Sequence, residues 1–366
     1  MPKKGFMLLK SFKYWEPGWS LDGISLGLTN LMVGKNSSGK SRALESLGSI
    51  IAFISQRKKK FLSPVFNVEL NFIEENNDII SYSLSLEGGK VSKEELITNN
   101  HIIIQRTAAS ALFEGETVNP PANMLLIHVR RDVEKYPVIE KIIKWAEESI
   151  IRSFTDDYAH DKKGLYELFE KFSPEMKSHL IEMINSVGFP VAFMDTFESI
   201  LAKTNNGGAD IHPDATEFKV IILQEKDVNV PLFLKNLSSG MYRTILLLVL
   251  IEQMVSHKKP ALLAIDDLGE GLDYSRAKKL GELIFRVCEH HHIQLIATSN
   301  EEFMMNIVDI NQWNVLVRKG EAVKTITSET CPEEFEDFKF SGLSNFDFFT
   351  SSFLNRITSK LFSEQQ

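Results

Sequence analysis

The residue types and spacing that most clearly imply chemistry lie at residues 34–41, which read Gly-Lys-Asn-Ser-Ser-Gly-Lys-Ser. This spacing is typical of a loop that wraps a phosphate, because glycines leave room for the backbone and a helix N-terminus aims its N–H groups at the anion. Lys40 would reach the β- and γ-phosphates of a nucleoside triphosphate, and the Ser41 hydroxyl would bind Mg²⁺. We assign the nucleotide contacts to Gly34, Lys35, Asn36, Ser37, Ser38, Gly39, Lys40, Ser41 and Arg42.

Two adjacent carboxylates, Asp266 and Asp267, follow the fully apolar residues 261–265. Such a run predicts a central parallel strand, and acids at its carboxyl end face the crevice where open α/β sheets bind ligands. We expect Asp266 to hold the Mg²⁺ shell and Asp267 to orient or deprotonate an attacking water. The alternative is that the pair caps the following helix, a role that Asp273 or Ser275 can supply equally well.

The elements that must position these groups follow from the hydrophobic periodicity. Residues 5–33 predict short strands, the last of which enters the loop, and a helix then extends to about Arg57. Residues 65–105 alternate as strands, residues 133–203 are predicted to be helical, and a flexible loop is expected at 205–208. Alternating strands and helices from residue 217 onward indicate a parallel α/β sheet. We therefore predict a nucleotide-binding domain built from residues 1–105 and 217–318, a mainly helical insertion at 106–216, and an extension at 319–366.

The bulk composition is that of a soluble globular protein, with 43% hydrophobic and 25% charged residues and a formal net charge of −8. An acidic chain binds nucleic acid only through a local basic patch. The cluster Arg57-Lys-Lys-Lys60 is either such a patch or a solvated helix end. Isolated Cys288 and Cys331 favour a reducing cytoplasm, and no apolar stretch is long enough for a membrane span.

A third motif, Leu237-Ser-Ser-Gly-Met241, begins a predicted helix before the acidic strand. With the loop and Asp266-Asp-Leu-Gly-Glu-Gly-Leu-Asp273, it resembles the ATP-binding-cassette (ABC) superfamily, whose signature at this place is Leu-Ser-Gly-Gly-Gln. The opening Leu8-Leu-Lys-Ser-Phe12 and residues 31–41 are similar to heads of the structural-maintenance-of-chromosomes (SMC) type and, more closely, to OLD-like ATPases. The resemblance covers residues 1–105 and 217–318 well and the segment between them poorly.

The resemblance implies an α/β P-loop NTPase: an ABC-type head with an N-terminal antiparallel β lobe, a parallel core sheet flanked by helices, and a helical insertion. It implies that two heads enclose two ATP molecules with Mg²⁺, so that the chain would form an ATP-dependent homodimer or a higher oligomer. The residues contacting the partner's nucleotide would be Leu237, Ser238, Ser239, Gly240 and Asp273. Gln105 is either the metal-binding glutamine of the superfamily's Q-loop or an ordinary surface glutamine.

Two residues depart from the superfamily's pattern. Asp267 stands where a glutamate usually follows the metal-binding acid, and Ser299 stands in place of the switch histidine, with Asn300 beside it. Lys40, Asp267 and Ser299 are thus the predicted catalytic residues. A carboxylate shortened by one methylene, and a switch residue that carries no charge, predict a slow ATPase.

OLD-like proteins often carry a C-terminal Toprim nuclease, and residues 319–366 are too short to form one. Stand-alone members commonly act beside a separately encoded effector, for example a nuclease, in prokaryotic anti-phage defence. We therefore predict a cytoplasmic sensor or scaffold that controls such an effector. The alternative is a DNA-associated ATPase of the repair or recombination type, which would bind duplex across a head dimer. A transporter ATPase subunit is disfavoured by Asp267, Ser299 and the long insertion.

Overall fold

The computed structural model describes residues 7–58, 63–154, 162–201, 216–257, 262–350 and 352–363. These residues form two compact units. Unit 1 contains the described parts of Met1–Ser153, Lys259–Leu268 and Phe285–Gln366, and unit 2 contains those of Phe154–Lys258 and Gly269–Ile284. Within these described ranges, no helix has both the length and the apolar character needed to cross a membrane.

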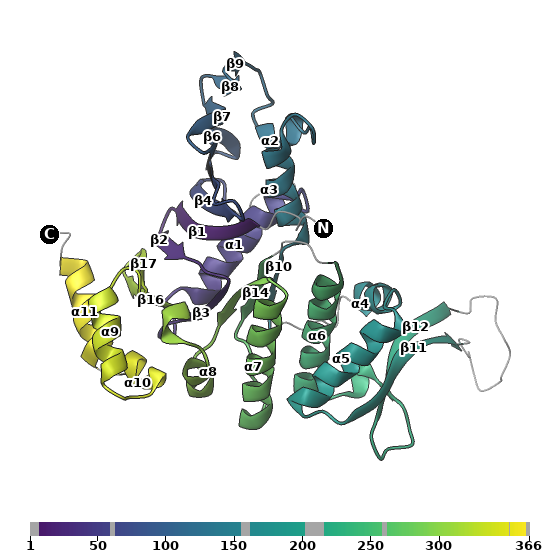
Figure 1. Ribbon diagram of the computed structural model, residues 1–366. Helices are drawn as coiled ribbons and strands as arrows, with labels where there is room; N and C mark the ends of the chain where they lie inside the picture. Colours follow the sequence, from purple (N-terminus) through teal and green to yellow (C-terminus); the bar gives the residue numbers. More distant parts are fainter. Residues whose placement is uncertain are drawn as a thin grey trace. The chain divides into compact units, whose positions relative to one another are not determined.

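Unit 1 is built on one mixed sheet, in which 14 strands are hydrogen-bonded among the described residues (Figure 1). In sheet order they are β10 (Ile150–Ser153), β14 (Leu262–Asp266), β15 (Gln294–Thr298), β3 (Thr29–Val33), β16 (Trp313–Lys319), β17 (Ala322–Ile326), β2 (Trp19–Ser25), β1 (Met7–Glu16), β4 (Phe66–Glu74), β5 (Ile79–Glu87), β6 (Lys90–Thr98), β7 (His101–Thr107), β8 (Ala111–Phe113) and β9 (Glu116–Thr117).

The sheet divides into a parallel core and an antiparallel lobe. The neighbouring strands from β10 through β14, β15 and β3 to β16 are parallel. All five residues of β3 and all five of β15 are buried, as the apolar runs predict for central parallel strands. From β1 through β4 to β9 the pairing is antiparallel. Along β4 and β5, apolar side chains on the buried face alternate with mostly polar side chains on the other face.

Helices bury their apolar faces in unit 1. They are α1 (Lys40–Ile54), α2 (Leu126–Val129), α3 (Pro137–Glu148), α8 (Glu302–Ile307), α9 (Pro332–Phe340), α10 (Asn345–Thr350) and α11 (Ser352–Ser363), with a 3₁₀ turn, η3 (Ile310–Gln312). Leu44, Leu47 and Ile51 of α1 recur at helical spacing and are buried, which gives α1 the stripe that packs in the core. A buried cluster of aromatic rings lies in the C-terminal helices of unit 1 and consists of Phe335, Phe338 and Phe348. Phe348 also contacts Trp313 of β16, so this C-terminal cluster packs against a strand of the sheet.

Unit 2 consists of helices and a small antiparallel sheet. Its elements are α4 (Lys162–Phe169), α5 (Pro174–Val187), β11 (Val191–Leu201), β12 (Thr216–Glu225), β13 (Leu232–Phe233), η2 (Leu234–Asn236), α6 (Ser239–His257) and the part of α7 (Tyr274–His290) up to Ile284. Local chemistry sets the ends of α5: Ser173 caps its N-terminus by accepting from Met176 N–H at 3.3 Å, and Gly188 ends it at φ 107°. In Figure 1, α5 lies beside α6 and against β11.

The expected insertion boundary at residue 106 differs from the structure, in which unit 2 begins at Phe154. Residues 106–153 stay in unit 1 because β7 to β9 continue the lobe, α3 packs on α1, and β10 pairs with β14. The helical prediction for residues 133–203 holds for α3, α4 and α5, and it is wrong for the strands β10 and β11. The loop expected at 205–208, as well as Lys59 and Lys60, lies outside the described residues.

Candidate functional site

The loop at residues 34–41 joins β3 to α1, as its sequence predicts. Two of its residues adopt left-handed backbone conformations, Ser37 at φ 65° and Gly39 at φ 104°. Gly39 is the N-cap of α1, and a Cβ placed there would lie 3.1 Å from Val323 Cγ2 of β17. The second glycine of the motif is therefore required both by its backbone conformation and by the close approach of a neighbouring strand.

The first glycine allows the loop to close on itself. A Cβ at Gly34 would lie 2.3 Å from Ser38 Oγ and 2.8 Å from the backbone oxygen of Leu316. Among the described residues, the buried Ser38 hydroxyl finds no hydrogen-bond partner. An orphaned hydroxyl in a glycine-lined loop at a helix N-terminus fits a loop whose missing partner is an anion.

Lys40 is buried within the same loop, with 6% of its surface exposed. Its Nζ donates to the backbone oxygen of Gly34 at 2.7 Å. Burial lowers the pKa of Lys40, and the carboxylates of Asp267 and Asp266 oppose this by favouring the charged form. The structure therefore brings Lys40 and both acids into one electrostatic environment, at the carboxyl ends of β3 and β14.

The acids are tied to the neighbouring strand β15. Thr298 donates from Oγ1 to Asp266 Oδ1 at 2.5 Å and accepts from the backbone N–H of Asp267 at 2.8 Å. Asp267 has a left-handed φ of 53°, which is uncommon for a residue with a side chain. Sequence reasoning missed Thr298; the signal that could have found it is a hydroxyl at the carboxyl end of the buried strand predicted to lie beside the acids.

Ser299 and Asn300 lie beside the loop. Ser299 is 2% exposed, its N–H donates to Met32 O of β3 at 3.4 Å, and its Oγ accepts from the N–H of Glu301 at 3.1 Å. Asn300 Nδ2 donates to Asn36 Oδ1, within the loop, at 3.0 Å. The predicted switch position is therefore next to the loop, and its hydroxyl is engaged at the start of α8.

Three further predicted contact residues are at least partly exposed. Ser41 and Lys35 are exposed, whereas Arg42 is half-buried. The Arg42 guanidinium donates to Glu16 Oε1 at 2.7 Å and lies 4.9 Å from the centre of the Trp19 ring. Arg42 thereby fixes the first turn of α1 against the β1–β2 pair.

The signature residues and Asp273 belong to unit 2. Ser238 and Ser239 are exposed at the start of α6, and Ser238 Oγ caps that helix by accepting from Met241 N–H at 3.3 Å. A Cβ at Gly240 would lie 2.6 Å from Leu272 Cδ2. Asp273 caps α7 by accepting from Arg276 N–H at 3.1 Å, and that N–H, together with the Arg276 side chain, lowers the pKa of Asp273.

Gln105 is not brought to this site. It lies on β7, paired with Glu95 of β6, and its side chain is exposed. Seven strands of the sheet lie between β3 and β7. The prediction of Gln105 as a metal ligand is therefore corrected to its alternative, an exposed glutamine of the lobe, because the antiparallel lobe carries it away from the carboxyl end of β3.

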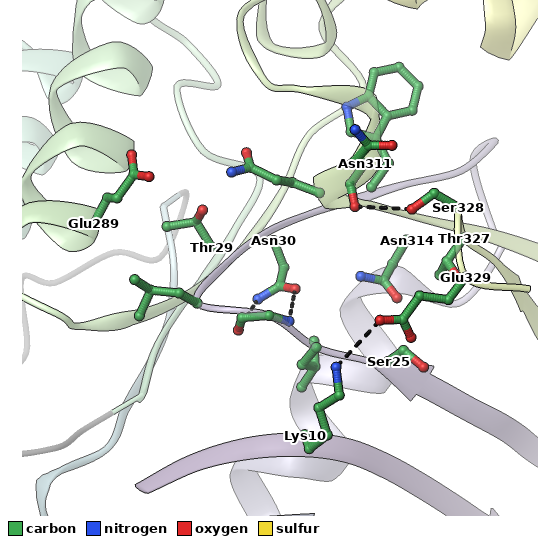
Figure 2. Close-up of a pocket in the computed structure, with 15 residues that line it drawn as sticks. Lys10, Ser25, Thr29, Asn30, Glu289, Asn311, Asn314, Thr327, Ser328 and Glu329 are labelled. Carbon is green, nitrogen blue, oxygen red and sulfur yellow. Dashed lines mark hydrogen bonds and ion pairs between the residues drawn. The ribbon is translucent and has the colours of Figure 1, made fainter. Parts of the chain in front are cut away.

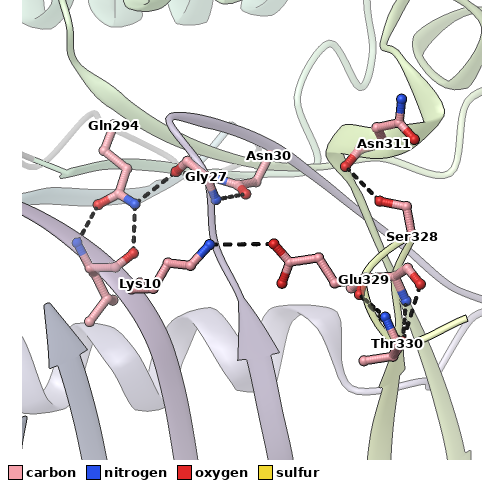
Figure 3. Close-up of polar contacts among 10 residues, drawn as sticks. Lys10, Gly27, Asn30, Gln294, Asn311, Ser328, Glu329 and Thr330 are labelled. Carbon is pink, nitrogen blue, oxygen red and sulfur yellow. Dashed lines mark hydrogen bonds and ion pairs between the residues drawn. The ribbon is translucent and has the colours of Figure 1, made fainter. Parts of the chain in front are cut away.

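A polar pocket of about 220 Å³ lies at the opposite end of β3, near Thr29 and Asn30 (Figure 2). Lys10 and Glu329 form an ion pair of 3.4 Å at its side. Gln294 of β15 donates to the backbone oxygens of Leu9 and Gly27 and accepts from Leu9 N–H (Figure 3). Three residues of β3, 31–33, lie between Asn30 at the pocket and Gly34 of the loop, and the four steps from Asn30 to Gly34 span roughly 13 Å. The polar groups of the pocket therefore tie the lobe to the core rather than form the predicted phosphate site.

No family model and no curated protein matches this chain. Among solved structures, an SMC head bound to the C-winged helix domain of ScpA matches with a TM-score of 0.51 and 12% identity, over 87% of this chain and 96% of that one. The SMC head domain from Thermotoga maritima has a TM-score of 0.47 and 14% identity, covering 87% and 98%. A Pyrococcus furiosus Smc head domain with an extended coiled coil, bound to the C-terminal domain of ScpA, has a TM-score of 0.45 and 11% identity, covering 92% and 100%. The first likeness confirms the predicted fold class, an α/β fold like that of an SMC head.

Proposed function

We propose that this chain is an ABC-type ATPase head that binds ATP with Mg²⁺ and dimerises around it. One observation carries the proposal: Gly34, Ser38 and Lys40 form a tight loop with a buried, unpartnered hydroxyl, and the acids Asp266 and Asp267 share the electrostatic environment of Lys40. Such a combination suits a phosphate chain and a divalent cation better than any other ligand class.

Each group of the loop has a defined task in this proposal. The N–H groups at the start of α1 bind phosphate oxygens, and Lys40 neutralises the β- and γ-phosphates. Mg²⁺ would be held by Ser41 and Asp266, and when bound it supplies neutralisation of phosphate charge. The lowered pKa of Lys40 comes from burial, and a bound triphosphate would offset that burial by favouring the charged form.

We propose that the dimer forms because the signature of one subunit completes the site of the other. Ser238 and Ser239 are exposed at the N-terminus of the long helix α6, where N–H groups and hydroxyls can contact an anion. A side chain at Gly240 would displace Leu272, so the first turn of α6 requires a glycine at this position. ATP would thus join two copies, and hydrolysis would release them.

Slow turnover is part of the proposal. Asp267 has a short side chain on a left-handed backbone, and the Ser299 hydroxyl is engaged with Glu301. Misplacement of a catalytic group by about 1 Å lowers a rate on the order of a hundredfold. We therefore propose a chain that holds ATP for long periods in the closed dimer.

We further propose that the dimer signals to a separately encoded effector, as OLD-like ATPases of prokaryotic defence do. Support for this role comes only from the resemblance of the sequence to OLD-like ATPases, and no residue of the chain indicates it. The DNA-associated alternative needs the basic cluster that begins at Arg57, and Arg57 itself donates to the backbone oxygens of Ala146 and Ser149 at 2.7 and 3.2 Å. Because those carbonyls lie at the C-terminal end of α3, Arg57 caps that helix, and its guanidinium is less available to a DNA phosphate.

Equilibrium binding of ATP tests the proposal, with a fluorescent analogue displaced by ATP in the presence and absence of Mg²⁺. Lys40→Ala should weaken binding by at least about tenfold, since a charge-assisted contact is lost. Lys58→Ala, an exposed lysine beyond the end of α1, is the matched control and should bind like the unmodified protein. Equal affinity for the two variants would refute ATP binding at this loop. Salt-sensitive DNA binding that Lys58→Ala weakens would instead favour the DNA-associated alternative.

A further inference from the structure

We propose that Thr298 is a positioning residue. It fixes the orientation of the Asp266 carboxylate for metal binding and that of the Asp267 carboxylate for activation of the attacking water. This inference rests on the proposed function. Thr298 is the last residue of β15, is 0% exposed, and lies beside the end of β14 because Ile265 pairs with Ala297 in parallel register. No motif in the sequence marks it.

The Thr298 hydroxyl contacts both acids at once. It donates to Asp266 Oδ1 at 2.5 Å and accepts from Asp267 N–H at 2.8 Å. A hydroxyl has one proton to donate, so Asp266 receives it and no other group can. The bond restrains the rotation of the Asp266 carboxylate and engages Oδ1, so that Oδ2 would be the oxygen available to a cation. Partners of this kind behind a metal ligand typically change metal affinity by about 10- to 100-fold when they are removed.

The same hydroxyl maintains the backbone conformation of Asp267. A left-handed φ of 53° is unfavourable for a residue with a side chain, and it persists only where the surroundings impose it. The surroundings here are Thr298: its hydroxyl accepts from Asp267 N–H, and its backbone oxygen accepts from Leu268 N–H at 3.0 Å. The backbone N–H groups of Asp267 and Leu268 therefore both donate to Thr298, one to its hydroxyl and one to its backbone oxygen. These two hydrogen bonds fix the backbone of Asp267 and thereby the direction of its side chain.

Thr298 also lies between the acids and the loop. The next residue, Ser299, donates to Met32 on β3, and Asn300 donates to Asn36 within the loop. A continuous set of hydrogen bonds and backbone thus runs from the loop through residues 298–300 to Asp266 and Asp267. A phosphate that displaces Asn36 or Asn300 would act on the acids through Thr298.

The test compares Thr298→Val, which deletes the hydroxyl at nearly constant shape, with Thr298→Ser, which keeps it. Thr29→Val is the matched control, because Thr29 is another buried threonine of the same sheet, at the amino end of β3 and away from the acids. Three quantities are measured in the full chain: ATP affinity in EDTA, the Mg²⁺ concentration that half-saturates Mg²⁺-dependent ATP binding, and kcat with KM. Thermal unfolding monitors the fold, and Thr298→Ala repeats the hydroxyl deletion if the valine variant does not fold.

We expect Thr298→Val to bind ATP in EDTA within about twofold of the unmodified protein, and to need about 10- to 100-fold more Mg²⁺. Its kcat should fall at least about tenfold with little change in KM, whereas Thr298→Ser and Thr29→Val keep both values within about threefold. An unchanged Mg²⁺ requirement for Thr298→Val, or a serine variant as impaired as the valine variant, would overturn the role of the hydroxyl. An unmodified protein that binds no ATP would overturn the proposed function instead, and the two failures are thereby distinguished.

Discussion

Replacement of Gly34 by alanine probes the tightest contact of the loop. The φ of Gly34 lies outside the left-handed region, so an alanine there adds a Cβ without backbone strain. That Cβ would meet Ser38 Oγ at 2.3 Å, which a side-chain rotation can relieve, and Leu316 O at 2.8 Å, which it cannot. Restoring an ordinary contact with the Leu316 carbonyl requires a displacement of about 0.6 Å between the loop and β16.

Two effects should follow from this displacement. Overpacking of this kind lowers the free energy of unfolding by about 1–3 kcal/mol. The Lys40–Gly34 hydrogen bond of 2.7 Å is also distorted; a bond to a charged group contributes about 1.5–3 kcal/mol, so ATP affinity should fall by about 10- to 100-fold. Thermal unfolding and displacement of a fluorescent ATP analogue measure the two quantities.

The matched control is Gly27→Ala, at the other end of β3, where a new Cβ would come no closer than 3.9 Å to Asn30 Oδ1. This variant should match the unmodified protein in ATP affinity and lie within about 0.5 kcal/mol of it in stability. If Gly34→Ala binds ATP as tightly as Gly27→Ala does, the reasoning from the loop geometry is wrong.

Three further predictions concern the frame around the site. Arg106→Met removes the cation beside the buried Glu94 carboxylate, and burial already raises the pKa of that carboxyl. Because a raised pKa in the folded state means that stability is lost as pH rises, urea unfolding should show a loss of about 3–5 kcal/mol in the free energy of unfolding at pH 8 that shrinks toward pH 4.5. A loss that is the same at every pH would contradict this reasoning. Phe348→Ala should lower the free energy of unfolding by about 3–5 kcal/mol in the same assay, because Phe348 is buried. Phe340→Ala, at a side chain that is 87% exposed, should lower it by less than about 0.5 kcal/mol. Equal losses for the two variants would show that the C-terminal helices are not part of the core. Burial raises the pKa of Cys288 to about 12, so a thiol reagent at pH 8 should label it only as fast as the protein unfolds, and labelling at the rate of a free thiol would exclude a buried Cys288.

Short-range patterns predicted the elements that build the core of the site. Residues 31–33 and 261–265 are apolar without interruption. Residues 31–33 lie in the buried strand β3, and residues 262–265 lie in the buried strand β14. The placement of Asp266 followed from the same rule, since a carboxylate after such a strand must lie at the carboxyl edge of the sheet. These inferences held because each depends on a few adjacent residues.

Long-range pairing could not be predicted in the same way. Residues 191–201 carry Phe193, Phe197 and Ile200 at spacings that fit a helical stripe as well as a strand. The strand forms because β12 pairs with it across a long intervening segment, with Met194 beside Leu223 in the buried layer. Gln105 was misplaced for a related reason, since only the full order of the sheet shows how far β7 lies from β3.

Side-chain hydrogen bonding between neighbouring strands was also beyond the sequence. Thr298 is separated from Asp266 by 31 intervening residues, and its place at the carboxyl end of a strand does not by itself reveal the partners of its hydroxyl. Only the parallel register of β14 and β15 brings its hydroxyl between the two acids.

Sedimentation of the purified chain with and without ATP and Mg²⁺ tests the central claim, that ATP joins two heads through their signatures. The account predicts a monomer without nucleotide, a doubled mass with ATP and Mg²⁺, and no doubling for Lys40→Ala. Ser239→Arg, at the exposed start of α6, should still bind ATP and yet remain a monomer. A chain that binds ATP and stays monomeric, or a dimer that forms equally without nucleotide, would contradict the account.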